Sequence, residues 1–266
     1  MSNRQNRKRI HALARRLVVG LLLLSMGCAT AGARAKEKQR FEKARSRLNL
    51  GIDYLRTGRV ELGLREFLIA EGLDPKNARI QYAIGDAYLL KDKYDEAELH
   101  YRNSITLAPN FHDARLNLSG LLMGKERWEE AITESAFLAD SATFPAPWRA
   151  LANQGWAEYK LGRTDEARRT LELARDFSPS YWPALLSLGV LEMEQGRRLE
   201  AITLFKDVLE HRPNSNAAAE ANYRIGEIYV ALGNRERAVS YLMAAVADTP
   251  GGPWGTKSEE YLQLLR

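Results

Sequence analysis

The chain has 266 residues, of which 45% are hydrophobic and 27% are charged, a composition that can build a sizeable core in a soluble helical protein. Its sequence pI is about 9.2, but six of the 39 basic residues and none of the 34 acidic ones precede Cys28. The remainder carries a formal charge of −1, so the basic pI gives no reason to expect nucleic acid as a partner. Cys28 is the only cysteine, which excludes an intrachain disulfide and a cysteine-rich metal cluster.

The first 27 residues have the layout of an export signal. Residues 1–16 are basic, residues 17–24 are apolar apart from Gly20, and the small residues Ser25 and Gly27 precede Cys28. The apolar stretch is too short to cross a bilayer as a stable helix. We therefore predict a signal peptide over residues 1–27, with an uncleaved membrane anchor as the alternative.

The residues around Cys28 also resemble a bacterial lipobox, with Ser25 in the place usually taken by leucine. That resemblance implies cleavage before Cys28, lipidation of this residue and lasting attachment through several acyl chains. The residue after the cysteine is Ala29. In similar lipoproteins, aspartate at this position favours retention in the inner membrane. The resemblance thus implies an outer-membrane, lipid-anchored protein that faces the periplasm, with residues 28–43 as a short tether.

Residues 78–111 contain the clearest copy of a unit that recurs along the chain. Gly85 and Ala97 are small, so two antiparallel helices can cross closely there, while Tyr101 fills the adjacent space. Pro109 ends the second helix because proline cannot continue the hydrogen-bond ladder. The spacing resembles the tetratricopeptide pattern, a helix-turn-helix repeat of 34 residues.

The same glycine and proline marks divide the chain into six units, with Ser119 in place of glycine in the third. The predicted repeats are 44–77, 78–111, 112–147, 148–181, 182–215 and 219–252. One pair of helices cannot bury its own apolar faces, so neighbouring pairs must stack. We predict an all-α fold, a right-handed superhelix of tetratricopeptide repeats (an α-solenoid). An insertion at 216–218 is expected before the sixth repeat, and a capping helix within 253–266, started by a capping box at Thr256–Glu259.

No catalytic arrangement emerges from the sequence. His100, His112 and His211 lie on different repeats without metal-ligand spacing, and each is expected on an exposed helix surface. The adjacent carboxylates Glu129 and Glu130 are expected on a solvated helix face rather than in acid–base work. We expect no enzymatic activity, cofactor, metal or small-molecule substrate.

A protein-binding surface is the function that remains. In tetratricopeptide proteins the first helix of each pair lines the concave side. The corresponding positions here are mostly apolar: Leu48, Ile52, Leu55, Tyr82, Leu89, Leu116, Met123, Trp156, Tyr159, Leu186, Val190 and Met193. They predict a partner-binding groove for an extended or helical apolar segment. A clamp for the C-terminal carboxylate of a partner would need lysine and asparagine at these places. The sequence has neither there, so this binding mode is disfavoured. The alternative is that several of these residues pack between neighbouring helices.

A lipidated cysteine followed directly by six such repeats resembles the PilF/PilW/Tgl family of type IV pilus biogenesis lipoproteins, the pilotins. The segments LNLGIDYLRTGR (48–59) and YAIGDAYLLKDKYDEAELHY (82–101) carry the most specific part of the resemblance. It implies that the protein binds secretin subunits and promotes their assembly in the outer membrane. The alternative of the same kind is a periplasm-facing scaffold that recruits cell-wall enzymes or other envelope complexes.

Overall fold

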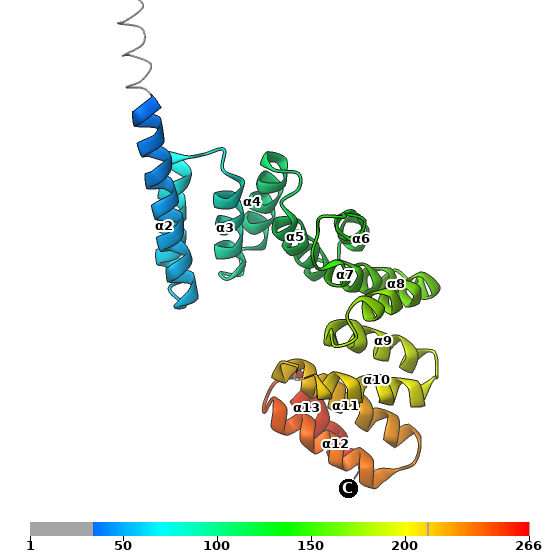
Figure 1. The fold of residues 1–266 in the computed structure, drawn as a ribbon. Coiled ribbons are helices and arrows are strands. Elements are labelled where there is room, and N and C mark those ends of the chain that lie inside the picture. The colour runs from blue at the N-terminus through cyan, green and yellow to red at the C-terminus, as the bar shows by residue number, and fades with distance from the viewer. Residues whose placement is uncertain (1–33, 212, 266) are drawn as a thin grey trace, which may run out of the picture. The chain divides into compact units, whose positions relative to one another are not determined.

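The computed structural model describes residues 34–211 and 213–265, and all regular structure within these ranges is helical, which confirms the all-α prediction (Figure 1). The chain divides into two compact units after Pro109, and each is described by itself. The predicted signal peptide and Cys28 lie outside the described residues.

The first unit contains two helix pairs. The first pair is a helix over residues 34–56 and α2 (Val60–Leu73), and the second is α3 (Ala78–Leu89) and α4 (Tyr94–Leu107). The two pairs share a core made of Ala44, Leu48, Phe67, Ala70, Ile80, Ala83, Ile84 and Ala87. Residues 34–43, expected as part of a tether that becomes helical toward its end, are helical and continue directly into the first repeat.

The second unit continues the same pairing. Its helices are α5 (His112–Gly124), α6 (Trp128–Ala139), α7 (Pro147–Lys160), α8 (Thr164–Phe177), α9 (Trp182–Glu194), α10 (Arg198–Glu210), α11 (Ser215–Ala231), α12 (Arg235–Asp248) and α13 (Pro253–Leu264). The first helices of successive pairs contact one another, α5 with α7, α7 with α9 and α9 with α11. They therefore form one continuous layer within this unit, as an α-solenoid requires.

Five of the six helix crossings depend on a glycine that faces a large side chain sixteen residues later. A Cβ atom at Gly85 would lie 2.7 Å from two ring carbons of Tyr101, and one at Gly189 would lie 2.5 Å from the Phe205 ring. The same relation holds for Gly51 with Phe67, Gly155 with Leu171, and Gly226 with Leu242. Because the facing side chains are fully buried, they cannot move aside, so only glycine permits this approach.

The third repeat solves the same crossing with two serines. Ser119 stands at the glycine position, and the residue sixteen places later is Ser135, so both partners are small. Both are fully buried, and their hydroxyl oxygens lie 2.8 Å apart in a hydrogen bond. Asn153 adds a hydrogen bond of 2.9 Å from its amide nitrogen to Ser119 Oγ. The extra volume of Ser119 is thus offset by the loss of volume at its partner.

This compensation predicts a coupled pair of substitutions. Ser135→Leu is expected to destabilise the protein by about 1–3 kcal/mol, because the leucine would overpack against Ser119. In Ser119→Gly/Ser135→Leu the crossing has the composition of repeat four, so most of that loss should be recovered. Urea unfolding of the two single variants and the double variant measures the coupling. Additive effects would contradict the compensation.

The turn between the two helices of a pair requires a left-handed backbone, seven residues after the crossing position. Four repeats place glycine there, and Gly58 and Gly162 have φ of +73° and +76°. Asp92 and Glu126 adopt the same conformation in repeats two and three, with φ of +56° and +58°. These two turns therefore carry conformational strain that the glycine turns avoid.

The C-terminal repeats contain the predicted insertion and one helix start that differs from expectation. Residues 216–218, predicted as an insertion before the sixth repeat, lie inside α11, which has 17 residues and whose N-cap Asn214 accepts a hydrogen bond from Ala217 N. The expected capping box at Thr256–Glu259 is wrong, since α13 begins at Pro253 and Thr256 lies within it. Proline fixes a helical φ and lacks the N–H that a first helical turn leaves unpaired, so it starts the helix earlier.

Candidate partner-binding groove

A groove of about 230 Å³ lies on the layer of first helices in the second unit. It draws on four successive repeats, and its lining is largely apolar. Its lining residues are Met123 from α5, Ala152, Asn153 and Trp156 from α7, Trp182, Pro183, Leu186, Ser187 and Val190 from α9, and Glu220 from α11. We call this the α7–α9 groove.

Helical spacing explains why these side chains share one surface. Ala152 and Trp156 are four residues apart on α7, and Leu186 and Val190 are four apart on α9. Residues at this separation lie on one face of a helix. The crossing glycines Gly155 and Gly189 face Leu171 and Phe205 of the second helices instead, beside the surface that forms the groove.

The polar groups of the groove are few. Asn153 and Ser187 lie among its apolar residues, and Glu220 stands at the end formed by α11. Burial raises the pKa of the Glu220 carboxyl group, while the positive charges of Arg224 and Lys257 oppose that shift. Arg224 lies 3.6 Å from Glu220 and 3.5 Å from Glu227, and its guanidinium is 5.1 Å from the Trp254 ring centre. This end of the groove therefore holds a paired, partly desolvated carboxylate.

The Trp156 ring forms an aromatic wall together with Tyr159, whose ring centre is 5.0 Å away. The Tyr159 hydroxyl donates a hydrogen bond to Glu194, and burial together with this bond raises the pKa of Tyr159. The Lys160 ammonium lies 5.6 Å from the centre of the Trp156 ring, within the range of a cation–π contact. These contacts fix the orientation of the indole ring in the wall of the groove.

Four of the residues predicted for a groove meet in this one. Met123, Trp156, Leu186 and Val190 line it, and Tyr159 supports its wall. Leu116 does not line it, because Leu116 lies in a separate core cluster with Leu138 and Phe144. Its assignment to the groove surface is therefore wrong.

The groove residues predicted in the first unit are largely packing residues. Leu48 is 4% exposed and lies in the core, while Ile52 and Leu55 are partly buried and pack against that core. Tyr82 is partly buried, with its ring centre 6.0 Å from that of Tyr101. Leu89 is also partly buried. The prediction that Leu48 lines a groove is therefore wrong, because Leu48 is a core residue. Ile52 and Leu55 pack between helices, which is the alternative stated for them.

Other lining residues were missed by sequence reasoning, although the repeat register contains the signal for them. Trp182 and Pro183 lie seven and six residues before Gly189, and Glu220 lies six before Gly226. The predicted positions lie within five residues of each glycine, whereas these side chains lie six or seven residues before it and also face the groove.

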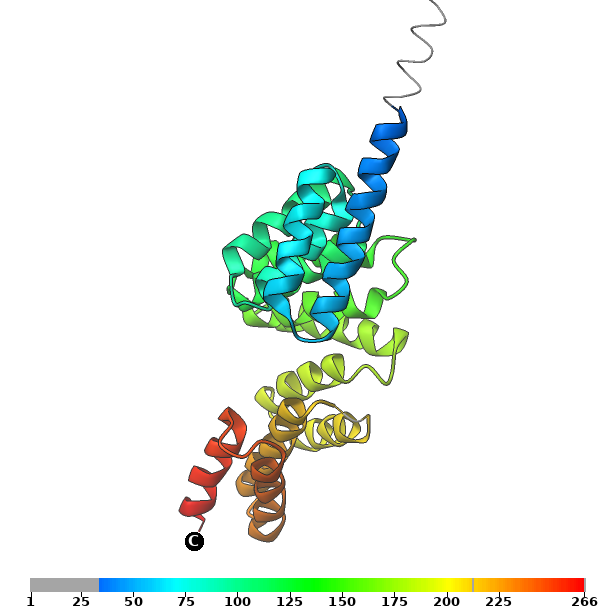
Figure 2. The same cartoon turned by 90° about the vertical axis from the view of Figure 1, so that its left-hand side faces the viewer.

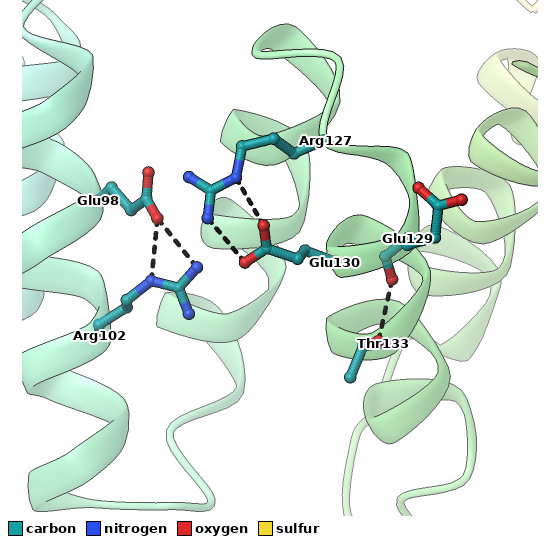
Figure 3. Close-up of polar contacts among 6 residues, drawn as sticks. All are labelled: Glu98, Arg102, Arg127, Glu129, Glu130 and Thr133. Carbon is teal, nitrogen blue, oxygen red and sulfur yellow. Dashed lines mark hydrogen bonds and ion pairs between the residues drawn. The ribbon is translucent and has the colours of Figure 1, made fainter.

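The charged residues singled out in the sequence form local ion pairs. At the start of α6, Arg127 donates two hydrogen bonds of 2.7 Å to the carboxylate oxygens of Glu130 (Figure 3). The Glu129 carboxylate lies 3.7 Å from Arg163. Figure 3 also shows the pairing of Glu98 with Arg102 at 2.9 Å within α4. These contacts support helix surfaces and provide no acid–base pair.

Two of the histidines are less exposed than expected. His100 stacks on Tyr88 with ring centres 5.5 Å apart and its Nδ1 lies 2.8 Å from Gln81 Oε1; burial lowers its pKa. His112 packs edge-on against Phe144, while His211 is exposed as predicted.

Within residues 34–211 and 213–265, no cluster of three or more metal-ligating side chains is found. In the same ranges, no helix is long and apolar enough to span a bilayer.

The fold is similar to those of several solved proteins. PilW, described as a widely conserved type IV pilus biogenesis factor, is 22% identical, with a TM-score of 0.71 over 80% of this chain and 97% of its own. PilF of Pseudomonas aeruginosa is 17% identical, with a TM-score of 0.70 over 84% of this chain and 99% of its own. A chain of the APC/C complex Cut9–Hcn1 is 18% identical, with a TM-score of 0.69 over 82% of this chain but 42% of its own. These likenesses establish the fold.

Family models identify the repeats directly. Among curated proteins, no sequence matches this chain at a significant level. Two models described as tetratricopeptide repeat match residues 48–110 and 116–181 and residues 192–255, which together make up well over half of the sequence. The chain therefore belongs to the tetratricopeptide repeat family.

Proposed function

We propose that this protein is an outer-membrane pilotin, a lipoprotein that binds secretin subunits and promotes their assembly for type IV pilus biogenesis and pilus-dependent motility. The observation that carries the proposal is the apolar α7–α9 groove in a chain whose fold matches PilW and PilF over 97% and 99% of their lengths. A tetratricopeptide fold alone does not choose the partner, since the Cut9–Hcn1 chain is nearly as similar.

The groove supports binding of an apolar protein segment in particular. Trp156 and Trp182 offer large rigid surfaces, the kind of side chain that dominates the energy of protein interfaces. Asn153 and Ser187 can exchange hydrogen bonds with the main chain of an extended segment. In this proposal the groove shields an apolar secretin segment from water and from other subunits.

The order of residues before Cys28 supports the location. The basic residues 1–16, an apolar stretch and small residues precede this single cysteine, and Ala29 follows it. Acyl chains on Cys28 would hold the repeats at the inner surface of the outer membrane, where secretin subunits must arrive. The anchor and the groove thus act together, one placing the protein and the other capturing the partner.

The test is secretin assembly in the organism that encodes the protein. Deleting the gene should deplete secretin multimers in the outer membrane while monomers accumulate. Wild-type protein should restore the multimers, and Cys28→Ala should restore far fewer because it is not anchored. Immunoblots of fractionated membranes measure both species. Normal multimers in the deletion strain would refute the proposal. A cell-wall enzyme recovered with the tagged protein in place of a secretin would favour the scaffold alternative.

A further inference from the structure

The first described segment of the chain is strongly basic, in contrast to the rest. Residues 34–47 contain seven basic and two acidic residues, a formal charge of +5. Residues 48–266 contain 26 basic and 32 acidic residues, a formal charge of −6. The positive charge that follows Cys28 is therefore concentrated in fourteen residues, which we call the basic segment.

The basic segment extends beyond the core of the first unit. Every residue from 34 to 43 is exposed, and the first buried residue of this helix is Ala44. Figures 1 and 2 show the start of the helix extending past the end of α2. Neither the packing of the first unit nor its helix crossings require this extension.

Most cations of the basic segment have no acidic partner. Arg47 pairs with Glu66 at 2.8 Å, and Lys38 lies 4.0 Å from Glu42 with both side chains largely exposed. Among the residues that the structure describes, no acidic side chain forms an ion pair with the other five: Arg34, Lys36, Arg40, Lys43 and Arg45. Like charges on an exposed helix repel one another, and an anionic surface would relieve this repulsion.

One face of this helix combines cations with an exposed aromatic ring. Six residues follow the spacing of a single helix face and border a common shallow depression, so that three cations and two carboxylates surround the ring: Arg34, Glu37, Lys38, Phe41, Glu42 and Arg45. The Phe41 side chain is 40% exposed, so its ring is accessible to a binding partner. Lysine and arginine beside an exposed phenylalanine are typical of helices that lie at the headgroup region of a bilayer.

We propose that the basic segment binds the surface of a bilayer that contains anionic phospholipids, with Phe41 inserted among the headgroups. Its placement rests on the proposed lipid anchor, because five residues separate Cys28 from Arg34, and the six Cα-to-Cα steps span at most about 20 Å. A chain anchored at Cys28 therefore holds this helix within reach of the headgroups. The attraction orients the first repeat against the membrane and supplements the acyl chains as a second membrane signal.

The test uses residues 29–266, which include every helix that the structure describes and lack both the signal and the lipid. This protein should sediment with vesicles of phosphatidylglycerol and phosphatidylcholine at 3:7, but not with vesicles of phosphatidylcholine alone. Binding should be lost in 0.5 M NaCl, because salt screens the attraction. Equal binding to both kinds of vesicle, or to neither, would overturn the proposal.

Substitutions locate the binding surface. Arg34→Gln/Lys38→Gln/Arg45→Gln should weaken binding to anionic vesicles on the order of 100-fold, since each basic residue near such a surface contributes roughly fivefold. The matched control removes three exposed cations of the second unit, Arg169→Gln/Arg198→Gln/Lys206→Gln, and should bind nearly as the parent does. Circular dichroism checks that both variants fold. If both triple variants lost vesicle binding equally, net charge alone would explain the binding, and the basic segment would not be a specific membrane-binding surface.

The Phe41→Ser variant tests whether the basic segment recognises a bilayer in particular or any polyanion. It should lower vesicle binding by about tenfold, because the aromatic ring no longer enters the headgroup region. Single-stranded DNA and polyglutamate serve as competing polyanions. If either binds more tightly than the vesicles, or if Phe41→Ser leaves vesicle binding unchanged, the membrane assignment is wrong. No secretin or acyl chain is used, so this result and the test of the pilotin proposal can fail separately.

Discussion

Trp156→Ala is expected to weaken binding of a secretin segment by about 30-fold or more. Trp156 lines the α7–α9 groove, and loss of a tryptophan from the centre of an interface commonly costs 2 kcal/mol or more. The Trp156 ring also contacts Tyr159 and lies under Lys160, so its removal takes away the aromatic wall of the groove. Affinity for a purified secretin subunit, measured by calorimetry or fluorescence anisotropy, tests this expectation.

A matched substitution separates groove chemistry from general loss of aromatic surface. Phe177 lies at the end of α8, is 56% exposed and does not line the α7–α9 groove, so Phe177→Ala should leave secretin affinity unchanged. Trp156 packs partly against the core of the second unit, so thermal unfolding of both variants must be recorded. A folded Trp156→Ala protein that binds secretin as tightly as the parent would eliminate the groove as the binding site.

Gly85→Ala should destabilise the first unit by about 1–3 kcal/mol, although alanine is the better helix former. The added Cβ would lie 2.7 Å from two ring carbons of Tyr101, where an ordinary contact is 3.4 Å or more. Tyr101 cannot rotate away, since it is fully buried and its hydroxyl donates a hydrogen bond of 2.7 Å to Asp86. The two helices of this repeat must therefore separate.

Gly72→Ala is the control for this change. Gly72 lies in α2 of the same unit, and a Cβ atom there would meet nothing within 4 Å. Alanine at this position should leave stability unchanged or raise it by up to about 1 kcal/mol, through helix propensity alone. Urea unfolding monitored by circular dichroism compares the two variants. If Gly85→Ala matches Gly72→Ala in stability, the close crossing does not limit the packing of this repeat.

The repeat architecture could be predicted because it depends on local chemistry. The glycines at the crossings and the prolines after the second helices each have a steric role that the sequence alone reveals. That each glycine faces the large side chain sixteen places later was visible only in the structure. Ser119 shows where such reasoning stops. The sequence showed that glycine was replaced, but its hydrogen bond to buried Ser135 depends on how two helices meet.

The start of α13 illustrates a second limit. Thr256 and Glu259 have the spacing of a capping box, and Pro253 and Gly252 also favour a helix start. Both signals are local and they compete. The structure begins the helix at Pro253, and Trp254 then packs with its ring centre 5.3 Å from that of Tyr223 on α11. The earlier start thus goes with a contact to another helix, and the spacing of residues in the sequence does not reveal such a contact.

By itself the sequence determined the all-α repeat fold, the register of the repeats and the apolar character of the first helices. Only the tertiary structure decided which apolar residues form a core and which form a groove. Leu116 and Leu186 occupy the same place, three residues before Ser119 and Gly189. Leu116 is buried in a cluster with Leu138 and Phe144, whereas Leu186 lines the α7–α9 groove. Helical periodicity fixes the face on which a side chain lies, but the residues that cover this face come from distant parts of the chain.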